Sequence, residues 1–304
     1  MTATTARTST RTTPMLFSRQ RQLLQLLDAL GGTSGMLDFQ KLLFLYCQEA
    51  STGEAPYDFV PYKFGAFSFT SYADRRKLIE RGLLEDEDGW QITAEGRKII
   101  GRTMDMQLAA FAKRHRGLHG DALVADTYRR FPFFATRSEI AERVLKGDDA
   151  ALARIKAVRA KATGPALSTI GYEGHTLESY LTILLRSGVT LLCDVRRNPI
   201  SRKYGFSKNT LARGCEGVGI RYEHLPELGI ASEKRKNLAA QAAIDALFAE
   251  YERDWLPTQG PALAKLRAWL DAGERVALTC FGRAPGDCHR RCVAKALDVG
   301  AQHL

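Results

Sequence analysis

Residues 167–197 have the sequence LSTIGYEGHTLESYLTILLRSGVTLLCDVRR. Two strand-like segments, at 167–172 and 189–197, enclose an amphipathic helical segment at 175–188. Strands that alternate with helices predict a mostly parallel sheet with helices on its faces. We therefore expect an α/β domain over residues 166–304.

The same alternation continues to the end of the chain. Further strands are predicted at 220–226 (IRYEHLP) and 274–281 (ERVALTCF), and a last helix at 288–300 (CHRRCVAKALDVG). Polar residues follow three of the predicted strands, beginning at Tyr172, Asp194 and Cys280. The carboxyl ends of parallel strands line the ligand crevice of such a sheet, so these residues predict one polar site.

Catalytic and substrate-binding roles are assigned within this site. We expect Asp194, Cys280 and His289 to be catalytic, and guanidinium groups around them to recognise a phosphate-containing ligand. The candidate substrate-binding residues are Tyr172, Arg196, Arg197, Ser201, Arg202, Phe206, Arg283 and Arg290. The alternative for Asp194 is a structural carboxylate that holds Arg196, and the alternative for Cys280 is a buried strand cysteine.

We expect no metal and no other cofactor. A zinc site formed by Cys280, Cys288, His289 and Cys292 is the alternative, but the C-x-x-C pair that is usual in structural zinc sites is missing. His289 lies at the start of the last predicted helix, where the helix dipole favours anions and lowers the pKa of a thiol.

Several motifs of residues 167–298 resemble the domain-of-unknown-function 488 family. They include IGYEG at 170–174, DVRRNPISR at 194–202, GIRYEHLPELG at 219–229 and CHR at 288–290. The resemblance implies an α/β fold with Rossmann- or rhodanese-like layering and a site built from these motifs. It implies no reaction.

The N-terminal part has a different pattern. Helices are predicted at 17–30, 37–47 and 71–81, followed by a short two-stranded wing with an acidic turn at 86–89 and a helix from Thr93. Residues 17–105 resemble the winged-helix-like domains of some bacterial regulators and antitoxins, which are α+β domains.

That resemblance predicts a DNA-binding helix. In a winged helix the third helix would present Arg75, Arg76 and Lys77 to a duplex. The alternative is that these charges only solvate a helix face. A net charge of +10 agrees with a polyanionic partner, because phosphates attract a basic surface and release counterions on binding.

The remaining segments and the composition place the protein in a broad class. We expect a disordered tail at 1–16 and a helical connector at 106–165, ended by Gly164-Pro165. A hydrophobic share of 45% and a charged share of 26% are those of a globular protein. No apolar run approaches the about 18 residues of a membrane helix, and six scattered cysteines favour a reducing compartment, so we expect a cytoplasmic protein without membrane contact.

Three hypotheses for function follow. The first is a nucleic-acid-directed enzyme, a glycosylase-like hydrolase in repair or defence, which acts on a modified or damaged base that it extrudes from DNA. The second is a DNA-binding regulator that senses a small anionic ligand or thiol oxidation. The third is a rhodanese-like sulfur carrier that uses Cys280. The sequence assigns no oligomeric state.

Overall fold

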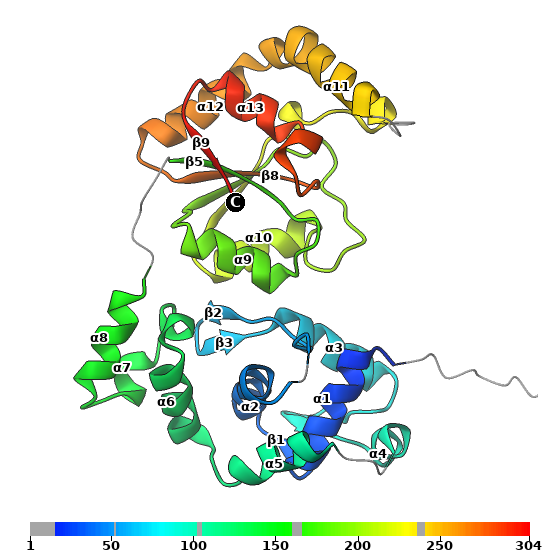
Figure 1. Cartoon of the computed structure of the whole chain (residues 1–304), viewed down its shortest axis with the longest axis vertical. Helices are drawn as coiled ribbons and strands as arrows, with labels where there is room; N and C mark the ends of the chain where they lie inside the picture. Colours follow the sequence, from blue (N-terminus) through cyan, green and yellow to red (C-terminus); the bar gives the residue numbers. More distant parts are fainter. Residues whose placement is uncertain (1–15, 52, 102–104, 160–165, 236–240) are drawn as a thin grey trace, which may run out of the picture.

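The computed structural model describes residues 16–51, 53–101, 105–159, 166–235 and 241–304. Two bodies stack along the long axis of the molecule, an N-terminal helical body and a C-terminal sheet with helices on both faces (Figure 1). The predicted tail, apart from Leu16, and the Gly164-Pro165 break lie outside the described residues. Within the described residues, no helix has both the length and the apolar character to span a membrane.

The N-terminal body contains the three predicted helices. Its elements are α1 (Ser18–Ala29), β1 (Thr33–Ser34), α2 (Met36–Glu49), β2 (Val60–Tyr62), β3 (Gly65–Phe67), α3 (Phe69–Glu80), β4 (Trp90–Gln91) and α4 (Ala94–Ile100). Gly82 follows α3 with φ +67°, as expected for a glycine that ends a helix. Thr93 caps α4 by accepting a hydrogen bond from the backbone N–H of Gly96.

The predicted wing is reduced, and an extra hairpin is present. Leu84 pairs with Ile92 in one antiparallel bridge, while β4 pairs with β1 instead of forming a two-stranded wing of its own. The hairpin β2–β3 lies between α2 and α3, where the sequence pattern had not predicted strands. The winged-helix class therefore stays a prediction.

The predicted connector is helical and packs on the N-terminal body. It contains α5 (Met106–Arg114), α6 (Gly120–Arg130), η1 (Pro132–Ala135), α7 (Ala141–Val144) and α8 (Asp149–Ala157). Leu108, Phe111 and Leu123 belong to the same buried core as the helices α1 and α2. α5 and the start of α6 therefore extend the first core, while the rest of α6 forms a smaller buried cluster with η1, α7 and α8.

The C-terminal body confirms the prediction of a mostly parallel sheet flanked by helices. Its strands are β5 (Leu167–Gly171), β6 (Leu191–Asp194), β7 (Arg221–His224), β8 (Val276–Cys280) and β9 (Ala301–His303). They lie in the order β7-β6-β8-β5-β9, and every neighbouring pair is parallel. Strand β9 was not predicted, because three residues at the end of a chain carry too little pattern.

The helices divide between the two faces of the sheet (Figure 1). α9 (Leu177–Arg186) and α10 (Lys208–Gly217) cover the face turned toward the N-terminal body, and α11 (Gln241–Glu250), α12 (Gly260–Asp271) and α13 (Arg290–Ala296) cover the other. Short turns complete the body: η2 (Pro226–Leu228), η3 (Ser232–Arg235), the π-helical turn η4 (Tyr251–Trp255), η5 (Leu256–Gln259) and η6 (Pro285–Asp287). Connections between parallel strands are almost always right-handed. A connecting helix therefore moves to the other face of the sheet when the chain begins to add strands in the opposite direction across the sheet.

A buried polar contact joins the two bodies. Glu178 on α9 is fully buried and accepts hydrogen bonds from the Ser68 hydroxyl, the Thr70 backbone N–H and the Thr70 hydroxyl, at 3.1, 2.7 and 3.1 Å. Ser68 is the N-cap of α3. The C-terminal body therefore holds the N-terminus of the helix that is predicted to contact DNA.

Candidate functional site

The strand order makes the carboxyl end of β8 the natural place for a site. β8 lies between β6 and β5, and the helix that follows β8 leaves on the opposite face from the helices that follow its two neighbours. In open parallel sheets ligands bind at such a point, because the diverging connections leave a crevice. Cys280 is the last residue of β8 and therefore stands at this position.

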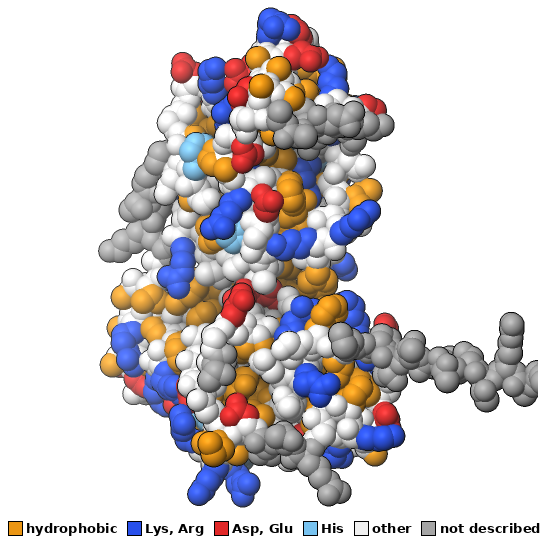
Figure 2. Space-filling view, turned by 45° about the vertical axis from the view of Figure 1, so that its right-hand side comes forward, with side chains coloured by type: hydrophobic (Ala, Val, Ile, Leu, Met, Phe, Trp, Pro, Cys, Tyr) orange, Lys and Arg blue, Asp and Glu red, His pale blue; other side chains and the backbone are white. Residues whose placement is uncertain are grey.

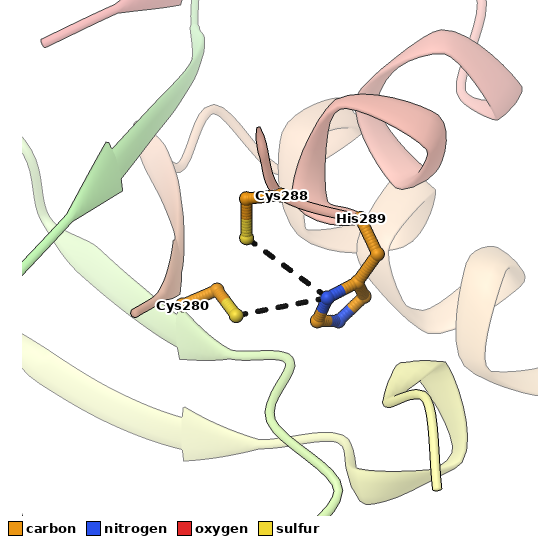
Figure 3. A group of neighbouring side chains, drawn as sticks. All are labelled: Cys280, Cys288 and His289. Atoms are coloured by element: carbon orange, nitrogen blue, oxygen red, sulfur yellow. Dashed lines mark hydrogen bonds between the residues drawn. The ribbon is translucent and has the colours of Figure 1, made fainter. Parts of the chain in front are cut away.

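Three side chains with thiol and imidazole groups meet there (Figure 3). The Sγ atoms of Cys280 and Cys288 lie 3.6 and 3.9 Å from Nδ1 of His289. All three side chains are buried, and their sulfur and nitrogen atoms lie within 4.8 Å of one another. We call these three residues the Cys–Cys–His centre.

The orientation of the His289 ring is set from the other side. Its Nε2 lies 2.9 Å from the backbone carbonyl oxygen of Val195, the residue that follows β6. Because a carbonyl oxygen only accepts hydrogen bonds, Nε2 carries the hydrogen, and in the neutral ring Nδ1 directs its lone pair at the two sulfurs. The imidazole is thus oriented as a base or as a ligand toward both thiols.

The two cysteines of the centre are not equivalent. The hydrogen bond with Cys280, together with burial, raises the pKa of Cys288 to about 12, although His289 opposes this shift. The Cys288 thiol therefore keeps its proton at neutral pH.

A small cavity of about 120 Å³ reaches the centre. Cys280, Cys288 and His289 form part of its wall, and the rest comes from the loop after β8 and from α11. The remaining lining residues are Ile244, Leu247, Phe248, Phe281, Gly282 and Asp287. A small molecule or an ion can reach the sulfurs from this cavity without passing through the sheet.

The loop that carries Cys288 is held in place by Arg290. This buried guanidinium donates to the carbonyl oxygens of Gly282 and Arg283, and to the hydroxyl of Thr169 in β5. A Cβ atom at Gly171 would lie 1.9 Å from the carbonyl oxygen of Gly282, so only glycine lets the loop approach the end of β5. Arg290, predicted to bind substrate, is therefore engaged by the chain itself.

Asp194 and Arg196 form a second polar cluster, and it is saturated. Asp194 is fully buried and receives hydrogen bonds from the backbone N–H and the guanidinium of Arg196, and from the hydroxyl of Tyr222 at 2.7 Å. The Arg196 guanidinium also donates to the hydroxyl of Tyr172 and to the carbonyl of Phe206. Burial lowers the pKa of Arg196, but the hydrogen bonds and charge of Asp194 outweigh it, so the pKa lies above its usual value. This geometry matches the structural alternative for Asp194.

The other predicted substrate-binding residues separate into two groups. Tyr172 and Phe206 are buried and stacked on each other, with ring centres 4.5 Å apart, and the Ser201 hydroxyl accepts a hydrogen bond from the backbone N–H of Lys203. The exposed members are Arg197, Arg202 and Arg283. Arg197 lines a separate cavity of about 140 Å³, next to Tyr251 and Trp255. The structure therefore does not gather the predicted arginines into one pocket.

The predicted DNA-binding residues also differ in their contacts and exposure. Arg75 donates to the carbonyl oxygens of Glu87 and Gly89, so it holds the acidic turn against α3. Arg76 and Lys77 are exposed. On the face drawn in Figure 2, Lys and Arg side chains are spread over both bodies, with acidic side chains between them.

Sequence reasoning underrated two residues. The sequence places Cys288 in the polar site and in a four-residue zinc alternative but assigns it no catalytic role, yet it faces His289 together with Cys280, whereas Cys292 is absent from the group and interacts with Glu252. Its neighbour His289 and its place before the last helix were the available signals. Glu178 gave no signal, because its partners lie more than a hundred positions away in the sequence.

A comparison with known families supports the assignment of the C-terminal part. Residues 176–297 match the family model described as domain of unknown function DUF488. The match includes the Cys–Cys–His centre and the Asp194 cluster, and covers less than half of the chain. Searches of curated proteins and of solved structures gave no significant match.

Proposed function

We propose that this protein is a DNA-binding regulator whose C-terminal domain senses thiol oxidation. The observation that supports the proposal is the placement of two cysteine sulfurs against one histidine nitrogen, beside a cavity that opens onto them. The N-terminal winged-helix-like domain would bind DNA, and the Cys–Cys–His centre would change its affinity. Six free cysteines agree with a cytoplasmic location, where thiols stay reduced.

The alternative of a base-directed hydrolase has less support in this geometry. Its predicted residues Asp194, Arg196 and Arg290 are buried and use their polar groups on the chain itself. A carboxylate that acts on a substrate must be within hydrogen-bond reach of it. The hydrolase hypothesis therefore retains Cys280 and His289 beside the cavity, together with exposed arginines that the structure leaves apart.

Oxidation would proceed by thiol chemistry with a peroxide as the oxidant. The Cys280 thiol transfers its proton to Nδ1 of His289, and the resulting thiolate attacks one peroxide oxygen, so that the O–O bond breaks and the other oxygen leaves as water after protonation. The Cys288 sulfur then displaces the hydroxyl of the Cys280 sulfenic acid as a second water. Two thiols lose two electrons and two protons in total, and one disulfide forms.

A disulfide would strain the present arrangement. Its two sulfurs lie about 2.05 Å apart, closer than separate thiols can approach. Cys280 belongs to the sheet and Cys288 to the loop held by Arg290, so the bond would draw this loop and the end of β8 toward each other. This movement is the proposed signal.

Contacts connect β8 to α3, the helix that is predicted to bind DNA. The hydroxyl of Tyr180 on α9 donates to the hydroxyl of Thr279, the residue before Cys280, at 2.6 Å. Two positions before Tyr180 stands Glu178, which binds Ser68 and Thr70 at the N-terminus of α3. N-terminal residues of a recognition helix are the ones that contact base edges. We infer that a shift of β8 loosens this contact and changes the access of α3 to DNA.

The experiment compares the full chain in its reduced and peroxide-treated forms on a library of random-sequence duplexes. We expect oxidation to change the affinity for the selected duplexes by about 5- to 150-fold, the usual range of coupling between two sites. Cys280→Ser and Cys288→Ser should bind DNA but lose the response. Cys292→Ser, which removes a buried sulfur outside the centre, is the matched control and should keep the response.

Four results would count against the regulator. Equal affinities before and after oxidation would remove the sensing role, and absence of salt-dependent duplex binding would remove the DNA partner. Release of a base from modified duplexes that survives Cys280→Ser would favour the hydrolase. A persulfide on Cys280 found by mass spectrometry after exposure to a sulfur donor, without a change in DNA binding, would favour the sulfur carrier.

A further inference from the structure

The Cys–Cys–His centre has the dimensions of a metal site. In a tetrahedral zinc site with bonds of about 2.3 Å to sulfur and about 2.0–2.1 Å to nitrogen, a ligating sulfur and nitrogen are about 3.6 Å apart. The observed distances from Nδ1 of His289 to the sulfurs of Cys280 and Cys288 are 3.6 and 3.9 Å. Both sulfur–nitrogen distances are therefore close to those of a zinc site, whereas the two sulfurs of a disulfide lie only about 2.05 Å apart.

The surroundings of His289 are those of a metal ligand. Ligating histidines nearly always donate their second ring N–H to a carbonyl or carboxylate, which orients the ring. Nε2 of His289 is 2.9 Å from the carbonyl oxygen of Val195, and Nδ1 faces the sulfurs. Val195 directly follows β6, the strand next to β8. The second ring nitrogen is therefore held from the sheet and not from the loop that carries Cys288.

The donor set also restricts the kind of ion. Two thiolates and one imidazole are ligands for Zn²⁺ and other soft or borderline ions, and they exclude Mg²⁺ and Ca²⁺, which take oxygen ligands. The cavity beside the centre leaves room for a water molecule or a small ligand as a fourth donor. Structural zinc sites have four protein ligands, so three ligands and an open position are typical of a reactive site.

We propose that Cys280, Cys288 and His289 bind one Zn²⁺ ion through the two sulfurs and Nδ1, with the fourth coordination position open to the cavity. This proposal departs from the expectation of no metal, which relied on the missing C-x-x-C pair. In the fold, the strand end supplies one sulfur and the start of the last helix supplies the other two ligands, so close spacing of two cysteines in the sequence is not needed.

The proposal deepens the regulator function but does not depend on DNA. If the regulator function is correct, peroxide oxidises both thiolates to a disulfide and Zn²⁺ leaves the site, because a disulfide is no longer a thiolate ligand. The binding of Zn²⁺ itself is measured without duplex. A failure of metal binding and a failure of DNA regulation are therefore separate results.

The test is a titration of the reduced, chelator-treated full chain with Zn²⁺ in competition with a chromogenic chelator. We expect one ion per chain and a rise in the thermal unfolding temperature with free Zn²⁺, since an ion that binds the folded state stabilises it. Co²⁺ in place of Zn²⁺ should give thiolate-to-metal charge-transfer absorption. Added azide should alter this spectrum by entering the open position.

Substitutions of the three proposed ligand residues make the test specific. Cys280→Ser and Cys288→Ser should each weaken Zn²⁺ binding by more than the roughly 10- to 100-fold loss that follows removal of an outer-shell partner. Cys292→Ser, which changes a buried cysteine of α13 outside the centre, should bind like the wild type. Circular dichroism shows whether each variant is folded, and His289→Asn provides a third ligand variant should one cysteine variant fail to fold.

Several outcomes of these experiments would overturn the zinc proposal. Absence of Zn²⁺ binding by the reduced chain, or equal binding by wild type and the three ligand variants, would exclude the site. Binding of Cu⁺ without binding of Zn²⁺ would exclude zinc as its ion. A Co²⁺ spectrum that does not respond to azide would show that the fourth position is closed.

Discussion

Two polar clusters lie at the same edge of the sheet and differ in what their groups contact. Asp194 and Arg196 are buried, oppositely charged and fully paired by the chain, through Tyr222, Tyr172 and the backbone. Cys280, Cys288 and His289 are equally buried, but they face one another and a cavity. Burial and polar composition therefore do not by themselves mark a reactive site. A reactive site keeps donor atoms directed at a space that a ligand can enter.

The largest loss of stability is expected when the cluster of Asp194 and Arg196 is disrupted. Asp194→Ala leaves the guanidinium of Arg196 buried without its carboxylate, and removal of one partner from a buried ion pair costs about 3–5 kcal/mol. We expect a loss of this size in the free energy of unfolding of the C-terminal domain, measured by urea denaturation followed by circular dichroism.

The matched control for this experiment is Arg197→Ala. Arg197 is the exposed neighbour of the cluster, and its removal should change the free energy of unfolding by less than about 0.5 kcal/mol. If Asp194→Ala or the milder Asp194→Asn unfolded like the wild type yet abolished an activity, Asp194 would be catalytic and the comparison would fail.

The second largest loss of stability is expected at Glu178. This buried carboxylate also has its hydrogen bonds satisfied, but the donors belong to the N-terminal body. Glu178→Ala leaves the buried Ser68 hydroxyl and the Thr70 backbone N–H without an acceptor, which costs about 1–3 kcal/mol. We expect a matching loss of stability together with a higher affinity for DNA, measured by calorimetry and by duplex titration.

Glu178 also predicts a dependence on pH. Burial raises the pKa of Glu178 above 4.5, although the hydrogen bonds from Thr70 and Ser68 oppose the shift. A carboxyl whose pKa is raised by folding binds its proton more readily in the folded state, so stability rises as the pH falls through the folded pKa toward 4.5. The wild type should therefore gain stability over Glu178→Gln on acidification, and parallel stability curves for the two would contradict the buried contact.

A smaller effect is expected from Tyr222→Phe. The variant removes one hydrogen bond to Asp194 and keeps the ring, and the bidentate contact with Arg196 remains. The loss should be about 1 kcal/mol, or slightly more because the acceptor is charged. A loss as large as that of Asp194→Ala would mean that Tyr222, rather than Arg196, carries the cluster.

Cys280→Ser is expected to have the smallest effect on stability. It should have a clear effect on the reactivity of Cys288. The hydrogen bond with Cys280 is the largest contribution to the raised pKa of Cys288, about 12, so the Cys288 thiol keeps its proton at pH 8. Its loss should lower that pKa and accelerate the alkylation of Cys288 by iodoacetamide, followed by peptide mass spectrometry.

Cys193 provides the reference for this measurement. Burial raises its pKa well above the ordinary value, and it lies inside β6, so it should stay unmodified in both proteins. Equal alkylation rates of Cys288 before and after the substitution would mean that the two sulfurs of the centre do not interact.

Local sequence determined the elements and the edge at which the site lies. The alternation of strands and helices from residue 167 onward predicted four of the five parallel strands, because an apolar run and an amphipathic helix are properties of neighbouring residues. The same reasoning placed Asp194 and Cys280 at strand ends and His289 at the start of the last helix. Strand β9 and the hairpin β2–β3 escaped it, since segments of three residues have no measurable period.

Only the tertiary structure decided which polar residues are partners. Asp194 and Cys280 are equivalent in a sequence reading, since each is a polar residue at the end of a buried strand. The order β7-β6-β8-β5-β9 places Cys280 at the centre of the edge, beside the loop that returns Cys288 and His289, and surrounds Asp194 with Arg196 and Tyr222. Strand order and the contact of Glu178 with α3 depend on residues far apart in the chain. Local patterns determine which element forms, but the pairing of distant elements is set by packing of the whole chain.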